Sequence, residues 1–239
     1  MIGSLLLGVF AFFKKDSLPS ADNLRAELNK EPRQIAVQRP LLQTQVKGVQ
    51  YSIQPRYSYD LYGLVVSLHD SDTWWDYAHR EWGDHVNVVD FCVVWGENVR
   101  EGAYRPLSYW NDQWTCWAKP DTDAAWKAFD PTAISNNHLV TDDPSVAREL
   151  RKVRIGDQVH LRGYLVDYSI VRNGAATAPR VTSTVRNDSG QGACEVVYVE
   201  DFEVLASPNR MWRAALKLAL GVLLASLIAW AFLPPRFND

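Results

Sequence analysis

The sequence contains little cysteine and methionine, and it has no stretch of low complexity. Three cysteines among 239 residues are too few for a small disulfide scaffold. Thirteen glycines and twelve prolines exclude a collagen-like protein. Charged residues make up 22% and apolar residues 47%, so the chain can build a packed core and global disorder is excluded. The length is typical of one domain with short appendages.

Long apolar runs occur only at the two ends. Residues 211–233 are apolar except for Arg213 and Lys217, and the last sixteen of them carry no charge. As a helix this segment would be about 34 Å long, which is enough to cross a hydrocarbon layer of about 30 Å. We therefore predict a transmembrane helix at 211–233, followed by a short tail at 234–239.

The first thirteen residues are also uncharged, and Lys14 and Lys15 follow them. As a helix they would reach about 20 Å, which is short for a membrane span. No basic residue precedes the run and no small-x-small cleavage site follows it, which argues against a cleaved signal peptide. Three interpretations of residues 1–15 stay open: a short or oblique membrane segment, an uncleaved signal-like anchor, or an apolar tail docked on the domain.

The formal charge is distributed unevenly. Residues 16–207 hold 19 Lys and Arg against 27 Asp and Glu, a formal charge of −8, whereas the two ends together are positive. An acidic body lacks the clustered basic side chains that neutralise phosphates, so we expect no nucleic-acid partner. Basic residues flank each apolar segment on the side of the central domain, which predicts membrane lipid as a partner and a cytoplasmic domain. A periplasmic domain stays open, because a folded domain of this length can be translocated despite flanking charge.

Strand patterns dominate the middle of the chain. We expect a tether at residues 16–47, with one short helix from Ala21 to Lys30, and a β-rich soluble domain at 48–207. A helix interrupts the strands, with Asp143 as its N-cap and Pro144 at its first position. The predicted strands are 51–53, 61–68, 88–95, 158–171, 180–186 and 194–205. Short strands and few helices predict a mainly β fold, either a small OB-like barrel or a sandwich.

Five short blocks stand out within residues 50–205. They are 63–67 (GLVVS), 92–96 (CVVWG), 135–139 (SNNHL), 156–166 (GDQVHLRGYLV) and 190–195 (GQGACE). Together they resemble the shared blocks of a family of uncharacterised bacterial membrane-anchored proteins. The resemblance implies a protein of the bacterial inner membrane with a single domain between membrane segments, and it implies no activity.

The densest polar and aromatic patch is residues 69–85, which holds three of the five histidines and five acidic residues. Imidazoles and carboxylates are ligands of zinc and non-haem iron, so His79, His85 and Asp84 are candidate metal ligands. Their spacing matches no established metal motif, and we predict no cofactor. Clustered Trp and Tyr between polar groups are also typical of a contact surface. The candidate binding residues are Trp74, Trp75, Tyr77 and Trp82.

Two further residues have side chains suited to catalysis. His138 and Cys194 are a candidate base and nucleophile, and Glu195 follows the thiol in the sequence. Structural roles are the alternative, because a cysteine next to apolar residues commonly lies in a core and His138 could hold a loop. Cys92 and Cys116 could form a disulfide in an extracytoplasmic domain, leaving Cys194 free, whereas in the cytoplasm all three would be reduced.

The sequence contains no established catalytic motif. We therefore predict a membrane-tethered, noncatalytic β-domain that binds a protein partner or supports an envelope complex. Two alternatives stay open: a metal- or cysteine-dependent hydrolase on the same scaffold, and a small-ligand sensor. Residues 186–192 are predicted to form a polar, glycine-rich hairpin loop.

Overall fold

The computed structural model describes residues 2–188 and 193–232. The chain divides into two compact units, which are treated separately: Met1–Ser17 with Ser207–Asp239, and Leu18–Ala206. The predicted tail and most of the glycine-rich loop tip lie outside the described residues.

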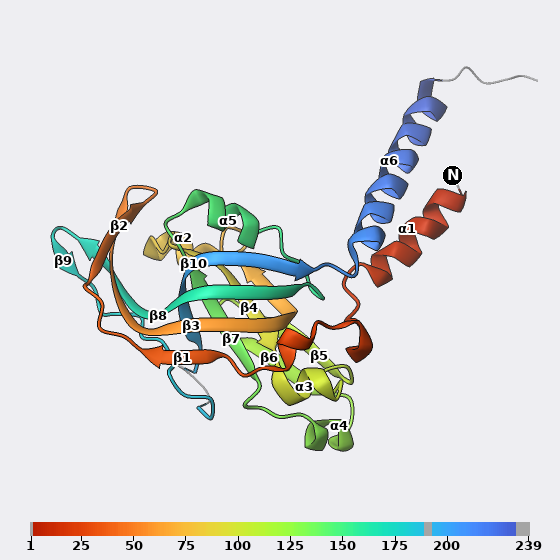
Figure 1. Cartoon of the computed structure of the whole chain (residues 1–239). Coiled ribbons are helices and arrows are strands. Elements are labelled where there is room, and N and C mark those ends of the chain that lie inside the picture. The colour runs from red at the N-terminus through yellow and green to blue at the C-terminus, as the bar shows by residue number, and fades with distance from the viewer. Residues whose placement is uncertain (1, 189–192, 233–239) are drawn as a thin grey trace, which may run out of the picture. The chain divides into compact units, whose positions relative to one another are not determined.

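The smaller unit consists of two helices (Figure 1). Helix α1 (Ile2–Lys14) packs along helix α6 (Arg210–Phe232), where a Cβ added to Gly8 would lie 3.5 Å from the Cβ of Ala219. α6 is long and apolar enough to cross a membrane, with a mean hydropathy of 2.1, and α1 is a shorter apolar helix. The N-terminal apolar segment therefore forms a helix pair with the predicted membrane helix.

The larger unit is mainly β (Figure 1). Its main sheet contains β1 (Arg33–Ala36), β2 (Leu42–Val46), β3 (Val49–Asp70), β4 (Asn87–Val94), β7 (Ile134–Val140), β8 (Gln158–Arg172), β9 (Ala175–Ala176) and β10 (Glu195–Ala206). A separate two-stranded sheet contains β5 (Leu107–Asn111) and β6 (Cys116–Pro120). The connecting helices are η1 (Ala21–Asn23), η2 (Ala26–Asn29), α2 (Tyr77–Trp82), α3 (Gly96–Arg100), α4 (Asp123–Ala128) and α5 (Pro144–Leu150).

Five strands of the main sheet pair in a cycle. β3 pairs with β4, β4 with β7, β7 with β10, β10 with β8, and β8 with β3. Only the β7–β10 pair is parallel, and the other four pairs are antiparallel. β1 and β2 add to β3, and β9 adds to β8. The parallel pair brings His138 opposite Val196, although 58 residues separate them in the sequence.

β4 is buried along its whole length. Phe91 and Val93 belong to one apolar cluster, and Cys92 and Val94 to another, because alternate side chains of a strand face opposite sides of the sheet. Each fully buried side chain of this kind stabilises the fold by about 1.5–3 kcal/mol. The strand predicted at 88–95 is therefore present as β4, and both of its faces are covered.

β8 passes very close to β10 at Gly163. A Cβ at this position would lie 1.9 Å from the carbonyl oxygen of Tyr198 and 3.2 Å from the backbone nitrogen of Glu200. The register of the β10–β8 pair shifts here, between Val199 and Asp201. An extra residue on one strand of a pair produces such a bulge, and glycine permits the close approach of the two backbones.

The helix predicted to begin at Asp143 and Pro144 is present as α5, and it follows β7, a strand that the sequence analysis did not predict. Asp143 accepts a hydrogen bond from the backbone N–H of Ser145 at 2.7 Å, and Pro144 occupies the first turn. Proline suits this position because its missing N–H would have had no partner inside the helix. Both sequence signals for this helix are therefore confirmed.

Two sequence expectations differ from the structure. Most of residues 16–47 belongs to the larger unit: β1 and β2 pair with β3, Leu28 is fully buried, and two 3-10 turns replace the expected helix at 21–30. Of the strand predicted at 180–186, only Arg180 forms a bridge, with Tyr168, and residues 181–186 lie outside the strands of the described chain. Thr182 donates its backbone N–H to Oδ1 of Asp167, so a side chain takes the place of a strand partner.

Candidate functional site

An open cavity of about 1330 Å³ lies in the larger unit. Three groups of residues line it: the segment around α2, the turn into β6 with strand β7, and the chain between β8 and β10. Residues of α2, β6, β7, β8 and β10 form more than half of the lining, and loop residues form the rest. β7 supplies the inner wall. Its aromatic, charged and hydrogen-bonding lining residues include Trp82, Asp84, Trp114, Trp117, Asn136, His138, Tyr168, Arg180 and Cys194.

The cavity brings together residues that the sequence analysis had singled out separately. Trp82, Asp84, His138 and Cys194 all line it. Glu195 follows Cys194 in an extended segment and does not line the cavity, because successive strand residues face opposite sides of the sheet. Glu195 therefore lies apart from the cavity that His138 and Cys194 line.

His138 is held between an acid and a guanidinium group. Its Nδ1 lies 2.8 Å from Oδ1 of Asp90, and its Nε2 lies 2.7 Å from Nη2 of Arg180. Arginine only donates, so Nε2 must accept and the proton of the neutral ring belongs on Nδ1, facing Asp90. Burial lowers the pKa of His138, against the opposing charge of Asp90. Neither ring nitrogen is free to take a proton from another group.

Asp90 keeps its charge despite complete burial. Burial alone would raise the pKa of this carboxyl, but His138 and Arg180 hold it below its ordinary value. The pKa of Arg180 is correspondingly raised by its acidic neighbours, although burial opposes the shift. Asp90 was not selected from the sequence because it is a single acidic residue within an apolar strand, and only its charge marked it as unusual there. Arg180 was missed because this residue was assigned to a strand.

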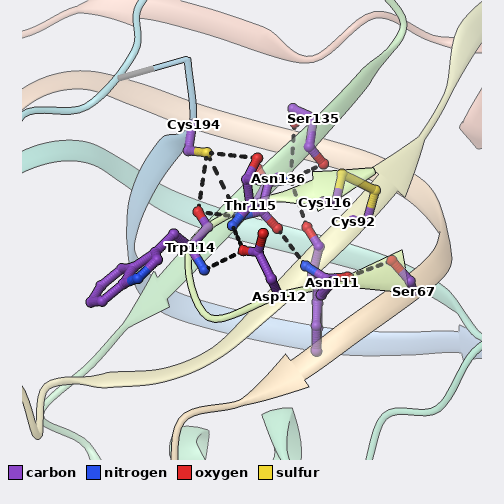
Figure 2. Close-up of a disulfide and its surroundings, with 12 residues drawn as sticks. Ser67, Cys92, Asn111, Asp112, Trp114, Thr115, Cys116, Ser135, Asn136 and Cys194 are labelled. Carbon is purple, nitrogen blue, oxygen red and sulfur yellow. Dashed lines mark hydrogen bonds between the residues drawn. A yellow bond between two sulfur atoms is a disulfide. The ribbon is translucent and has the colours of Figure 1, made fainter. Parts of the chain in front are cut away.

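Cys194 is a half-buried thiol among neutral polar groups (Figure 2). Its Sγ lies 3.7 Å from Nδ2 of Asn136, 3.6 Å from the carbonyl oxygen of Trp114 and 3.8 Å from Oγ1 of Thr115. Burial raises the pKa of this thiol. A reactive cysteine needs a lowered pKa, normally from a cation or a histidine beside the sulfur. The surroundings of Cys194 therefore keep it protonated.

A disulfide lies next to this thiol in the fold (Figure 2). Cys92 of β4 is bonded to Cys116 at the start of β6, 24 residues further along the chain. The bond attaches the small sheet to the main one. Asn136 connects the two sulfur sites, because it pairs with Cys92 across the sheet and donates its amide toward Cys194.

Glu195 forms a buried ion pair with Arg186, away from the cavity lining. Burial raises the pKa of Glu195 to about 7, although Arg186 opposes the shift. Arg186 also stacks over the rings of Tyr59 and Trp95, at 5.5 and 5.3 Å. These contacts hold the Arg186 guanidinium beside the Glu195 carboxylate.

The tryptophans of the cavity continue into an exposed aromatic surface. Trp82 stacks on Trp114 with ring centroids 5.0 Å apart, and Arg180 lies over Trp114 at 5.4 Å. Trp82 is 57% exposed and Trp117 is 48% exposed. We call Trp82, Trp114 and Trp117 the aromatic rim. The predicted binding residues Trp74, Trp75 and Tyr77 are also exposed, but they do not line the cavity.

The predicted metal ligands are only partly brought together. Among the described residues, the cluster with suitable donor atoms is His69, Asp76 and His79, all three of them buried. His85 is not a member, and Asp84 lies 4.0 Å from Nε2 of His79. Sequence analysis missed His69 because it closes the long strand β3, whereas Asp76 was counted only as one of several acids in the patch.

The chain was compared with protein families, with curated proteins and with solved structures. No family model, no curated protein and no solved structure matches the chain.

Proposed function

We propose that the chain is a membrane-anchored, noncatalytic binding domain whose cavity takes a segment of a protein partner. The observation that carries the proposal is the open cavity of about 1330 Å³ with exposed tryptophans at its rim. Pockets for small ligands usually measure about 300–1000 Å³, so this one has room for an extended chain segment. Tryptophan and arginine at the edge of a concave site are the residues that most often dominate binding energy.

The polar groups in the cavity argue against the hydrolase alternative. Arg180 donates to Nε2 of His138, and Nδ1, which faces Asp90, carries the proton of the neutral ring, so no ring lone pair is free for general-base work. Burial raises the pKa of the Cys194 thiol, which disfavours the thiolate that a cysteine nucleophile requires. A ligand-binding role uses the same groups as fixed hydrogen-bond partners.

The strand pairing supports an OB-like barrel for the larger unit. The cycle β3–β4–β7–β10–β8 contains one parallel pair, and α5 connects its third and fourth strands in sequence. OB-folds bind their ligands on the face of the second and third strands, between the loops that follow the first and the fourth. The cavity lies at that place, since its lining comes from the β3–β4 loop, β7 and the β8–β10 loop.

We propose that the larger unit lies on the oxidising, periplasmic side of a bacterial inner membrane, anchored by α6 and with α1 beside it. The disulfide Cys92–Cys116 supports this side, because structural disulfides are rare in reducing cytoplasm. The flanking basic residues favour the opposite orientation. The covalent bond weighs more, because charge bias sets orientation only weakly for a segment that is followed by a long folded domain.

A small polar ligand is the second candidate occupant of the cavity, and a carboxylate in the cavity lining favours it. Oδ1 of Asp84 is buried without a hydrogen-bond partner among the described residues, while Oδ2 accepts from the hydroxyl of Tyr168 at 2.6 Å. A buried, unpaired carboxylate oxygen costs free energy that a hydroxyl or amine of a ligand would recover.

The test compares co-purification of partner proteins from detergent-solubilised membranes. The variant Trp82→Ala/Trp117→Ala is expected to recover at least about tenfold less of the partner than the unaltered chain, because each exposed anchor is worth more than about 1 kcal/mol. Trp126→Ala is the matched control, since Trp126 is 46% exposed in α4 and does not line the cavity. Equal recovery with all three chains would count against the cavity as the contact site.

A further inference from the structure

The segment from residue 70 to residue 85 buries polar side chains and exposes aromatic ones, the reverse of the usual arrangement. Ala78 is its one buried apolar side chain, whereas Ser71, Asp76, His79 and Asp84 are buried polar residues. Its large aromatic side chains point to solvent, with Trp74 80% exposed. Burial of apolar surface is the main force that holds most segments in place, and this segment obtains little of it. Another interaction must therefore fix its conformation.

Three buried donor atoms converge behind this segment. Nε2 of His69 and Nδ1 of His79 each lie 2.7 Å from Oδ2 of Asp76, and the three atoms lie within 4.8 Å of one another. The local structure explains the convergence. Asp76 is the N-cap of α2 and accepts the backbone N–H of His79 at 3.1 Å, which places the two side chains together, and His69 reaches them from the end of β3.

We propose that His69, Asp76 and His79 bind a divalent transition-metal ion, with zinc as the ion that this donor set suits best. Two imidazole nitrogens and one carboxylate oxygen are a ligand set for zinc, and a water molecule completes four-coordination. The absence of sulfur from the cluster disfavours ions that require thiolates, and the two imidazoles disfavour calcium and magnesium. The proposal does not depend on the cavity's ligand.

The surroundings of His79 have the form expected around a metal-bound imidazole. Its second nitrogen, Nε2, lies 3.1 Å from the side-chain amide of Asn87 and 4.0 Å from Oδ2 of Asp84. A histidine that binds a metal through one nitrogen usually donates the other N–H to a carbonyl or carboxylate oxygen. Turning the Asn87 amide would present Oδ1, which has no hydrogen-bond partner among the described residues.

The same contacts can also be a hydrogen-bond chain in which Asp76 accepts protons from two neutral imidazoles. The two arrangements differ in one respect: a chain of hydrogen bonds needs protons on Nε2 of His69 and Nδ1 of His79, whereas an ion replaces both protons. A bound ion would join the end of β3 to α2, and would thereby fix the loop that carries Trp74, Trp75 and Trp82.

The experiment titrates the full chain in detergent with Co²⁺ and Zn²⁺ after dialysis against a chelator. We expect one equivalent to bind, with Co²⁺ giving visible ligand-field absorption, and Zn²⁺ in excess raising the melting temperature by about 5 °C or more. Elemental analysis after gel filtration measures the retained zinc. Failure of the unaltered, folded chain to bind either ion would overturn the proposal, and this outcome needs no variant.

Two variants locate the ion. Asp76→Asn and His79→Gln are expected to weaken metal binding by at least about tenfold. His85→Gln is the matched control, because His85 belongs to the same segment but not to the cluster. Far-ultraviolet circular dichroism checks that each variant is folded. Binding that Asp76→Asn and His79→Gln leave unchanged, or that His85→Gln weakens equally, would place the ion elsewhere and overturn the assignment. Recovery of a protein partner is a separate readout, so the two proposals can fail independently.

Discussion

Gly163→Ala is expected to destabilise the larger unit by about 4 kcal/mol or more, because the added methyl group has no room. The new Cβ would lie 1.9 Å from the carbonyl oxygen of Tyr198 and 3.2 Å from the backbone nitrogen of Glu200. Both are backbone atoms, which cannot rotate away as the end of a side chain could. Relief requires β8 and β10 to separate where they pair, next to the bulge at Glu200. Thermal unfolding of the full chain in detergent, followed by tryptophan fluorescence, measures the loss.

Gly221→Ala is the control for that substitution. Gly221 lies in α6, and a Cβ there would meet no atom within 4 Å. Alanine is also the better helix former, so this variant should match or slightly exceed the stability of the unaltered chain. If Gly163→Ala unfolded at the same temperature as Gly221→Ala, the close approach of β8 to β10 would be wrong.

Cys92→Ala/Cys116→Ala is expected to lower the free energy of unfolding by about 3 kcal/mol. The disulfide closes a loop of 24 residues, and its removal returns conformational freedom to the unfolded chain. A reductant should produce a similar loss in the unaltered chain and none in the double variant. The measurement is a denaturant titration of the full chain with and without reductant.

The same cysteines report on the compartment. Thiols trapped in intact cells with an alkylating reagent of high mass, under denaturing conditions, should show one alkylated cysteine without reductant and three with it. Cys194 supplies the one that is free. Three alkylated cysteines without reductant would place the domain in a reducing compartment and contradict the proposed periplasmic location.

Local signals in the sequence identify several elements correctly. The apolar run at 88–95, the Asp143–Pro144 start of α5 and the long uncharged C-terminal segment each depend on residues close together in the chain. Periodicity and capping describe such elements well. β1 and β2 were assigned to a tether because residues 16–47 contain Pro19, Pro32 and Pro40 and a stretch of mixed charge, which suggest an extended chain. Their pairing with β3 is decided by distant residues.

The candidate site was predictable only in fragments. Trp82, Asp84, His138 and Cys194 were selected by residue type, but their common position depends on the parallel pairing of β7 with β10. A single sequence contains no signal for such a pairing. Arg180 was missed for a different reason. The residue pattern at 180–186 predicted a strand. In the structure Arg180 forms only an isolated bridge with Tyr168, and Thr182 bonds to the side chain of Asp167 instead of to a neighbouring strand.

The cavity also explains why catalytic residue types need not indicate catalysis here. Arg180 occupies one nitrogen of His138 at 2.7 Å, so the imidazole is a fixed structural acceptor. An Arg180→Met exchange would free that nitrogen, yet it would also leave Asp90 buried without its cation, a change that commonly costs about 3–5 kcal/mol. In the proposed binding role, the ion network shapes the wall of the cavity.

Site-specific photo-crosslinking in intact cells tests the binding role most directly. A photoreactive amino acid in place of Trp82 should yield a discrete crosslinked species of higher mass, because this side chain lines the cavity and is exposed. The same amino acid in place of Trp126, which is exposed outside the cavity, should yield none. Absence of any crosslinked species at residue 82, or identical species at both positions, would contradict a cavity that binds a protein partner.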